Sequence, residues 1–256
     1  MSDMEPLSLS LITLLWAAGL LAGFVDSIAG GGGIISLPVL LSTGMPPHLA
    51  LGTNKLQGTF GSLTSSFNYW RKGLVDFNVI PVGIVFTAMG ALAGTISVQL
   101  MPAGYLKHII IVLLALVFIY TVLTPELGEK EKPPIIPELA FYGCAGLTLG
   151  FYDGFFGPGT GSFWCISIVL LMGAGLKKAT AHTKVLNFTS NIVALSAFFI
   201  GGNIMLPAGI AMGIGQSMGA YTGSRLVIKK GTGFIRFFLM AVVAATLSKL
   251  IYSTYF

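Results

Sequence analysis

Apolar residues along this chain fall into ten runs, separated by short segments rich in glycine, proline and charge. The first half holds runs at 7–29, 34–43, 49–70, 78–100 and 105–124; the second half holds runs at 138–156, 162–173, 179–201, 205–224 and 233–254. Eight of these are long enough, or nearly so, for a helix that crosses the ~30 Å of hydrocarbon in a bilayer, whereas 34–43 and 162–173 are too short. The pattern predicts an all-α integral membrane protein with one short helix in each half.

Composition supports this class. The 256 residues are 54% hydrophobic and only 9% charged, with a mean hydropathy of +0.86, whereas roughly 25% of residues are charged in a soluble domain. The net charge of +5 comes from basic residues spread thinly along the chain. They form no stripe of the kind that binds nucleic acid, so a lipid bilayer is the expected partner and a nucleic acid is not.

One segment stands out as a linker. Residues 125–137 combine charges with four prolines, a composition that breaks helices. We therefore divide the chain into a first unit at 1–124, the linker at 125–137 and a second unit at 138–256. The segment before the first run carries Asp3 and Glu5 but no lysine or arginine, so we expect no cleaved secretory signal there.

The two units are copies of one another. G-F-V-D at Gly23–Asp26 matches G-F-Y-D at Gly150–Asp153, displaced by 127 positions, and Lys55 matches Lys184, displaced by 129. Met89-Gly90-Ala91 matches Met218-Gly219-Ala220 at the same displacement of 129. A displacement held over such a distance predicts a tandem duplication.

The basic residues predict that the copies are inverted. The first copy carries Arg71 and Lys72 in the link after its third run, whereas the second copy carries Lys177 and Lys178 one link earlier and Arg225 one link later. Because basic loops stay in the cytoplasm, equivalent loops lie on opposite faces. Each inverted repeat then has a broken, re-entrant helix hairpin followed by three transmembrane helices. The linker is cytoplasmic and both termini face the periplasm.

The hairpins break at glycines. Four glycines at 30–33 and the stretch G-P-G-T-G at 157–161 sit at equivalent places in the copies. Each break exposes the N-terminus of a short helix, which favours an anion, and in secondary transporters such ends meet near the midplane. Close helix packing is the alternative reading of these glycines. The candidate substrate-binding residues here are Gly31, Gly32, Gly33, Gly159, Thr160 and Gly161.

Asp26 and Asp153 form one charged pair inside apolar runs, Lys55 and Lys184 form another, and each pair is retained across the duplication. Each charge costs at least ~2.5–3.5 kcal/mol at a span centre, so we expect the aspartates to pair with the lysines or to titrate. Structural ion pairs between the repeats are one interpretation. The functional interpretation is that the lysines neutralise an anionic substrate while Asp26 or Asp153 exchanges a proton.

Polar neighbours of the lysines extend the candidate site. Asn54 and Gln57 flank Lys55, and Thr183 and Asn187 flank Lys184, so these side chains can donate hydrogen bonds to substrate or bond neighbouring helices. His182 has Thr53 as its first-copy equivalent, which favours a packing role. We expect the aromatic side chains of Tyr69, Trp70, Phe163 and Trp164 at membrane boundaries.

Three motifs resemble the sulfite exporter TauE/SafE family of bacterial membrane proteins: G-F-V-D-S-I-A-G-G-G-G at 23–33, P-P-H-L-A-L-G-T-N-K at 46–55 and G-F-Y-D-G-F-F-G-P-G-T-G at 150–161. The resemblance runs from about Leu11 to Tyr252. It implies export of small sulfur-containing anions such as sulfite, sulfonates or sulfoacetate across the bacterial inner membrane, driven by the proton gradient. One departure is that T-N-K at 53–55 becomes H-T-K at 182–184, so symmetric substrate contacts from the two copies are not expected.

Other functions are weighed against this one. A passive anion channel and an importer of an organosulfur anion would use similar residues. An enzyme is not expected, since the chain lacks H-E-x-x-H and no motif unites Ser162 with His182. The glycine motifs fit neither a phosphate-binding loop nor a dinucleotide fingerprint. Cys144 and Cys165 lack metal-site spacing, so neither a cofactor nor a metal is predicted. The oligomeric state is left open.

Overall fold

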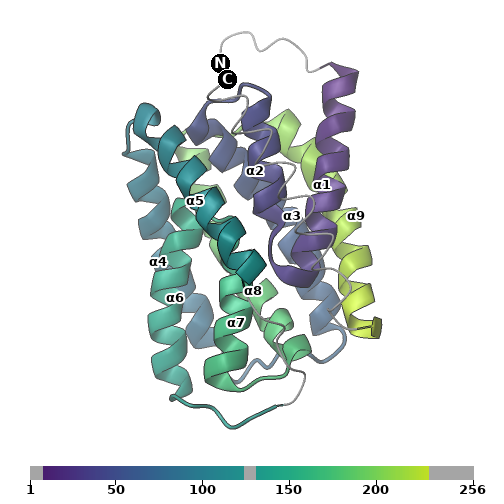
Figure 1. Ribbon diagram of the computed structural model, residues 1–256, viewed down its shortest axis with the longest axis vertical. Helices are drawn as coiled ribbons and strands as arrows, with labels where there is room; N and C mark the ends of the chain where they lie inside the picture. Colours follow the sequence, from purple (N-terminus) through teal and green to yellow (C-terminus); the bar gives the residue numbers. More distant parts are fainter. Residues whose placement is uncertain (1–7, 124–130, 231–256) are drawn as a thin grey trace.

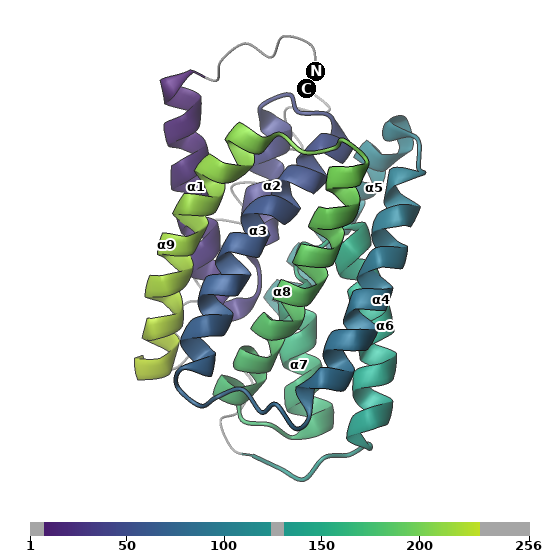
Figure 2. The same ribbon diagram turned by 180° about the vertical axis from the view of Figure 1, so that it is seen from behind.

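The computed structural model describes residues 8–123 and 131–230. This part of the chain is helical and contains no strand (Figures 1 and 2). Its helices, in chain order, are α1 (Leu9–Ala29), α2 (Gly32–Ser42), α3 (Pro47–Trp70), α4 (Ile80–Gln99), α5 (Ala103–Leu123), α6 (Glu138–Phe155), α7 (Thr160–Met172), α8 (Leu176–Ile200) and α9 (Leu206–Lys230).

Each apolar run in the described part of the chain corresponds to one of these helices. Three of them, α1, α4 and α8, are long and apolar enough to cross a membrane by length and composition. The tenth run, 233–254, lies outside the described residues. The protein is thus an all-α integral membrane protein, as its pattern predicts.

Helices α3 and α8 carry most of the buried polar side chains in the described part of the chain, and they lie in the middle of the bundle (Figure 2). Large apolar side chains instead point outward around the molecule, as they do where lipid is the solvent. The exposed ones include Leu14, Leu21, Leu63, Val85, Met89, Leu92, Ile96, Val112, Leu116, Leu147, Phe151, Ile192, Ile210, Ile214 and Met218.

Glycines bring two pairs of helices into close contact. A β-carbon on Gly150 of α6 would lie 2.6 Å from the Thr87 carbonyl oxygen of α4, and one on Gly23 of α1 would meet the Gln216 backbone of α9. Small residues at such crossings let backbones approach and increase dispersion contact, which is a main source of helix association in lipid. The α4–α6 and α1–α9 pairs (Figures 1 and 2) therefore form a tightly packed frame around the centre.

Inside this frame the short helices enter from opposite ends. The chain reverses between α1 and α2 and again between α6 and α7; α2 occupies the upper half of both views and α7 the lower half (Figures 1 and 2). Two buried apolar clusters lie on either side of a polar middle: one joins α1, α2 and α5 to the beginning of α3, the other joins α6, α7 and α8 to its end. The division into two inverted repeats stays a prediction. Inverted repeats would have their short helices enter from opposite ends of the bundle, as α2 and α7 do.

The end of the linker is attached to the second hairpin. Backbone N–H groups of Lys132 and Ile135 donate to the carbonyl oxygens of Gly173 and Leu171, each at 2.8 Å. This extended segment therefore runs beside the C-terminus of α7.

The expected aromatic belt is wrong for two of its members. Tyr69 and Trp164 are fully buried in the second apolar cluster, and the Tyr69 hydroxyl donates to the Ser27 carbonyl oxygen at 2.8 Å. Trp70, by contrast, is half exposed. Sequence position near a helix end does not reveal which side of the helix faces the bundle, and here adjacent aromatic residues point to opposite sides.

Candidate functional site

The two helix breaks touch each other. Gly30 adopts a left-handed backbone with φ of +76° and ends α1, while Gly159, with φ of +83°, precedes α7. A β-carbon on Gly161 would lie 2.5 Å from the Cα of Gly30, and one on Gly33 would lie 3.1 Å from the Cα of Pro158. The N-terminal ends of α2 and α7 therefore meet at the centre of the bundle, with backbone against backbone.

A carboxylate occupies the N-terminus of α2. The Gly32 N–H donates to Oδ1 of Asp26 at 3.3 Å, and the other carboxylate oxygen of Asp26 lies 3.1 Å from the Lys184 Nζ. The Lys184 side chain is fully buried and that of Asp26 is 14% exposed. The anion that the free N–H groups and the helix dipole favour is here supplied by the protein itself.

The reciprocal pair links Lys55 to Asp153. Nζ of Lys55 lies 2.6 Å from Oδ1 of Asp153 and also donates to the Asp153 carbonyl oxygen. The second carboxylate oxygen accepts from the Ser190 hydroxyl. Both charged side chains are at least 95% buried. Each lysine thus bonds the aspartate of the other half, as the pairing interpretation predicted.

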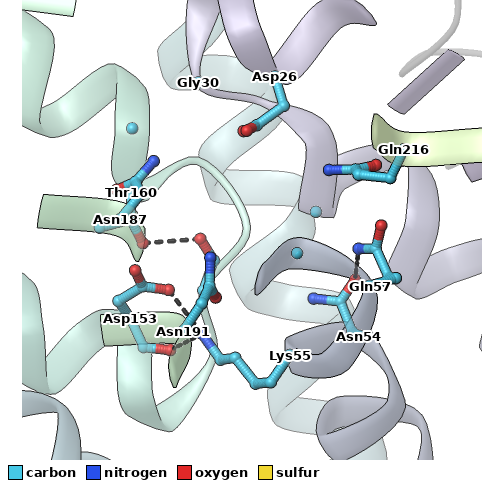
Figure 3. Close-up of a pocket in the computed structure, with 14 residues that line it drawn as sticks. Asp26, Gly30, Asn54, Lys55, Gln57, Asp153, Thr160, Asn187, Asn191 and Gln216 are labelled. Carbon is cyan, nitrogen blue, oxygen red and sulfur yellow. Dashed lines mark hydrogen bonds and ion pairs between the residues drawn. The ribbon is translucent and has the colours of Figure 1, made fainter. Parts of the chain in front are cut away.

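A cavity of about 30 Å³ adjoins these pairs (Figure 3). By the same measure a single water needs roughly 10–15 Å³, so this form has room for about two waters. The walls come from both hairpins and from α3, α8 and α9. The lining residues are Asp26, Gly30, Gly33, Asn54, Lys55, Gln57, Gly58, Asp153, Gly157, Thr160, Gly161, Asn187, Asn191 and Gln216.

Five carboxamides project toward this cavity. Gln57 Nε2 donates to the Ser36 hydroxyl at 3.0 Å and to Asn54 Oδ1 at 2.8 Å, and the Ser36 hydroxyl donates to the same Asn54 oxygen at 2.5 Å. This network connects α2 to α3 and fixes the orientation of both amides. Asn187 and Asn191 lie across the cavity from Gln57, whereas Gln216 lies on the same side as Gln57 (Figure 3).

Nine of the predicted site residues line the cavity. They are Lys55, Asn54, Gln57, Asn187, Gly33, Thr160, Gly161, Asp26 and Asp153. Lys184, Thr183, Gly31, Gly32 and Gly159 do not line it. Lys184 reaches the site only through its ion pair with Asp26, so the cavity is asymmetric with respect to the two lysines.

Three side chains of the site escaped the sequence analysis: Asn191, Gln216 and Ser190. Asn191 lies one helical turn beyond Asn187 on the same face, and Gln216 interrupts an apolar run. Helical spacing could have found the first, and the cost of a polar group in lipid could have drawn attention to the second. Ser190 carries no comparable signal, because serine is common in membrane helices.

His182 lies outside the cavity. Its Nε2 accepts from the Asp76 backbone N–H at 3.1 Å, and its Nδ1 lies 3.0 Å from the Tyr142 hydroxyl. These bonds connect the α3–α4 loop to α6 and α8, in keeping with the packing role expected for this residue. Within residues 8–123 and 131–230, no three His, Cys, Asp or Glu side chains gather in a way that would hold a metal ion.

Known proteins resemble the chain over nearly its full length. The family model described as sulfite exporter TauE/SafE matches residues 15–250. The chain is 42% identical over 245 residues to the probable membrane transporter protein YfcA of Escherichia coli strain K12, which covers 96% of this chain and 91% of that protein. A probable membrane transporter protein of Haemophilus influenzae is 39% identical, covering 96% of each chain, and the protein ORF9 of Sinorhizobium sp, with the same description, is 41% identical, covering 97% and 95%. With a family model and full-length relatives in agreement, this chain belongs to the sulfite exporter TauE/SafE family.

Proposed function

We propose that the protein is a secondary transporter of small sulfur-containing anions, such as sulfite or a sulfonate, coupled to protons and working in export. The substrate binds where the two helix breaks meet, on Lys55 and the polar side chains around it. The observation that carries this proposal is the pair of crossed ion pairs, Lys55 with Asp153 and Lys184 with Asp26, beside a polar cavity at the centre of the bundle.

In this form the anion positions are filled by the protein's own carboxylates. Asp26 takes the N-terminus of α2, and Asp153 takes the ammonium group of Lys55. A substrate anion gains little from a lysine whose charge is already neutralised, and a carboxylate displaced from its lysine is costly in a dry interior. Protonation of the aspartate removes both obstacles, because it frees the lysine and leaves a neutral acid.

Proton binding and anion binding therefore favour each other. Such coupling is reciprocal: a proton on Asp153 raises anion affinity, and a bound anion raises proton affinity by the same factor. Proton and anion then travel in the same direction. A large outward anion gradient drives export, whereas an inward proton gradient drives uptake. Because the same coupling allows uptake, an importer is kept as the alternative function.

Transport requires the cavity to open to each side in turn. Space for about two waters is too small for an organic sulfonate, so the hairpins have to separate from α3 and α8 as substrate enters. Rocking of one half against the other is the common way in which transporters with inverted repeats achieve this. The contact between Gly30 and Gly161 lies at the surface along which such halves would slide.

Orientation follows from the positive-inside rule. Arg71 and Lys72 follow α3, Lys177 and Lys178 are in the first turn of α8, and Lys229 is in the last turn of α9; these three helix ends lie at the same end of the bundle (Figures 1 and 2). We place this end in the cytoplasm of a bacterial inner membrane, with the first residues of the chain on the periplasmic side.

Flux of labelled sulfite and sulfonates into proteoliposomes tests the proposal. We expect Lys55→Ala to reduce flux by roughly tenfold or more, since truncation of one partner in a buried charge pair costs several kcal/mol of binding. Lys72→Ala, an exposed lysine at the end of α3, is the matched control. Undiminished flux in Lys55→Ala would exclude the site. A channel differs in that, with voltage clamped, its flux does not respond to an imposed pH gradient.

A further inference from the structure

The cavity contains acceptors that nothing in the described part of the chain satisfies. Gln57 Oε1, Asn187 Oδ1 and Gln216 Oε1 are each buried and have no hydrogen-bond donor there, and all three residues line the cavity. Gln57 and Gln216 are 1% exposed and Asn187 is 5% exposed. Buried polar groups are nearly always hydrogen-bonded, so three unsatisfied oxygens around one small cavity indicate that its occupant brings donors.

The orientation of Gln57 makes this argument firm for one of them. Its amide nitrogen donates to Ser36 and Asn54, so a flipped amide would set its oxygen against the Asn54 oxygen and lose that hydrogen bond. Gln57 Oε1 therefore remains the atom without a hydrogen-bond donor. Gln216 is held in place in another way, since its side chain fills the notch above Gly61, where a β-carbon would lie 2.7 Å from its Nε2.

These acceptors lie beside the cationic side of the same cavity. Lys55 and the N-termini of α2 and α7 attract negative charge, whereas amide oxygens repel it and accept from O–H or N–H groups. A fully ionised anion without a donor, such as an alkyl sulfonate, would bind the cationic side and leave the oxygens unpaired. Sites of this kind discriminate strongly, because a ligand lacking the donor leaves buried polar groups unsatisfied.

We propose that the site selects small sulfonate-type anions that carry their own hydroxyl donor, with the hydroxyl bound by the amide oxygens of Gln57, Asn187 and Gln216. This rests on the proposed function and specifies the substrate class of the same site. Gln216 is the specificity-determining residue to test first, because it comes from α9, outside the two hairpins, and takes part in neither ion pair.

Two isosteric anions test the proposal by calorimetric titration of the purified protein. 2-Hydroxyethanesulfonate carries the donor, and propane-1-sulfonate replaces its hydroxyl by a methyl group. We expect the hydroxyl compound to bind about ten to a hundred times more tightly, as unsatisfied buried acceptors imply. Equal affinity would overturn the inference and leave the proposed function intact, since water would then be satisfying the oxygens. If neither compound binds, the inference is overturned, whereas the proposed function fails only if labelled sulfite also shows no flux.

Variants then locate the selectivity. Gln216→Leu is expected to reduce the preference for the hydroxyl compound several-fold, because the hydroxyl loses an acceptor and propane-1-sulfonate no longer leaves that oxygen unpaired. Thr222→Val, on an exposed face of α9, is the matched control and should keep the native ratio. Asn187→Leu serves as an independent second variant if Gln216→Leu does not fold. A native ratio in every folded variant would overturn the assignment.

Discussion

The backbone of Gly30, at the end of α1, lies directly against the backbone of Gly161, in the first turn of α7. The two residues are 131 positions apart. Gly30 is where the first hairpin reverses, and Gly161 lies where α7, the short helix of the second hairpin, begins. No other residue fits there, because the space that a side chain would need is filled by the opposite backbone. The glycines therefore allow close packing and also line the cavity, so the two interpretations drawn from the sequence are compatible with one another.

Substitution at this contact should abolish transport. Gly161→Ala places a β-carbon 2.5 Å from the Gly30 Cα, which forces the hairpins apart, and we expect flux to fall to background with a lowered thermal unfolding midpoint. Gly44→Ala is the control: Gly44 also has a positive φ, of +83°, but nothing lies within 4 Å of its β-carbon position. It should lose only the ~1–2 kcal/mol of a strained backbone and keep transport. Normal flux in Gly161→Ala would refute the close contact.

Removal of one charge from the Lys55–Asp153 pair should destabilise the protein more than removal of both. A buried charge without its partner typically costs ~3–5 kcal/mol, so Lys55→Met and Asp153→Asn should each lower the unfolding midpoint. The double variant, with no unpaired charge, should recover much of this loss but stay inactive in transport. The measurement is thermal unfolding in detergent beside flux. Additive losses in the double variant would show that the two side chains do not interact.

In the α4–α6 pair, alanine substitution should lower stability at one glycine of α6 and be tolerated at another. A β-carbon on Gly150 would lie 2.6 Å from the Thr87 carbonyl oxygen, whereas one on Gly143, two turns earlier in α6, would lie 3.9 Å from its nearest neighbour, Phe86. Gly150→Ala should therefore lower the unfolding midpoint, and Gly143→Ala should leave it unchanged or raise it slightly because alanine is the better helix former. Equal effects would mean that α4 and α6 do not pack as described.

Single-cysteine labelling tests the orientation. With Cys144 and Cys165 replaced, cysteines at positions 72 and 229 should react with a membrane-impermeant maleimide only from the cytoplasmic side. A cysteine at 202, in the link between α8 and α9 at the other end of the bundle, should react only from outside. Opposite labelling of 72 and 229 would contradict the inverted arrangement of the two units.

The helices could be predicted from sequence because lipid imposes a strong rule. Backbone groups in hydrocarbon must be satisfied within a helix, so the apolar runs give the helix positions to within a few residues, and the glycine clusters mark where the short helices begin. The ion pairs could be anticipated too, since two lysines and two aspartates in apolar runs need partners. The hydrogen bond from Ser190 to Asp153 could not, because it depends on how the helices pack.

The cavity itself was only partly predictable. Asn54 and Gln57 were found because they flank a buried lysine, but Thr183 is on the wrong side of α8 and Lys184 is screened behind Asp26. Gln216 belongs to the site because Gly23 and Gly61 let α9 come close enough. Such tertiary approach leaves no periodicity in the sequence, and the buried positions of Tyr69 and Trp164 escaped prediction for the same reason.

Proton movement driven by an anion gradient tests the coupling between Asp153 and Lys55 most directly. Proteoliposomes containing a pH-sensitive dye are given an inward gradient of 2-hydroxyethanesulfonate, a permanently ionised acid that brings no proton across by itself, with voltage clamped. The native protein should acidify the interior as the anion enters, and Asp153→Asn should not. Anion entry with no acidification, or with alkalinisation, would contradict the account, because anion and proton would then not share one bound state.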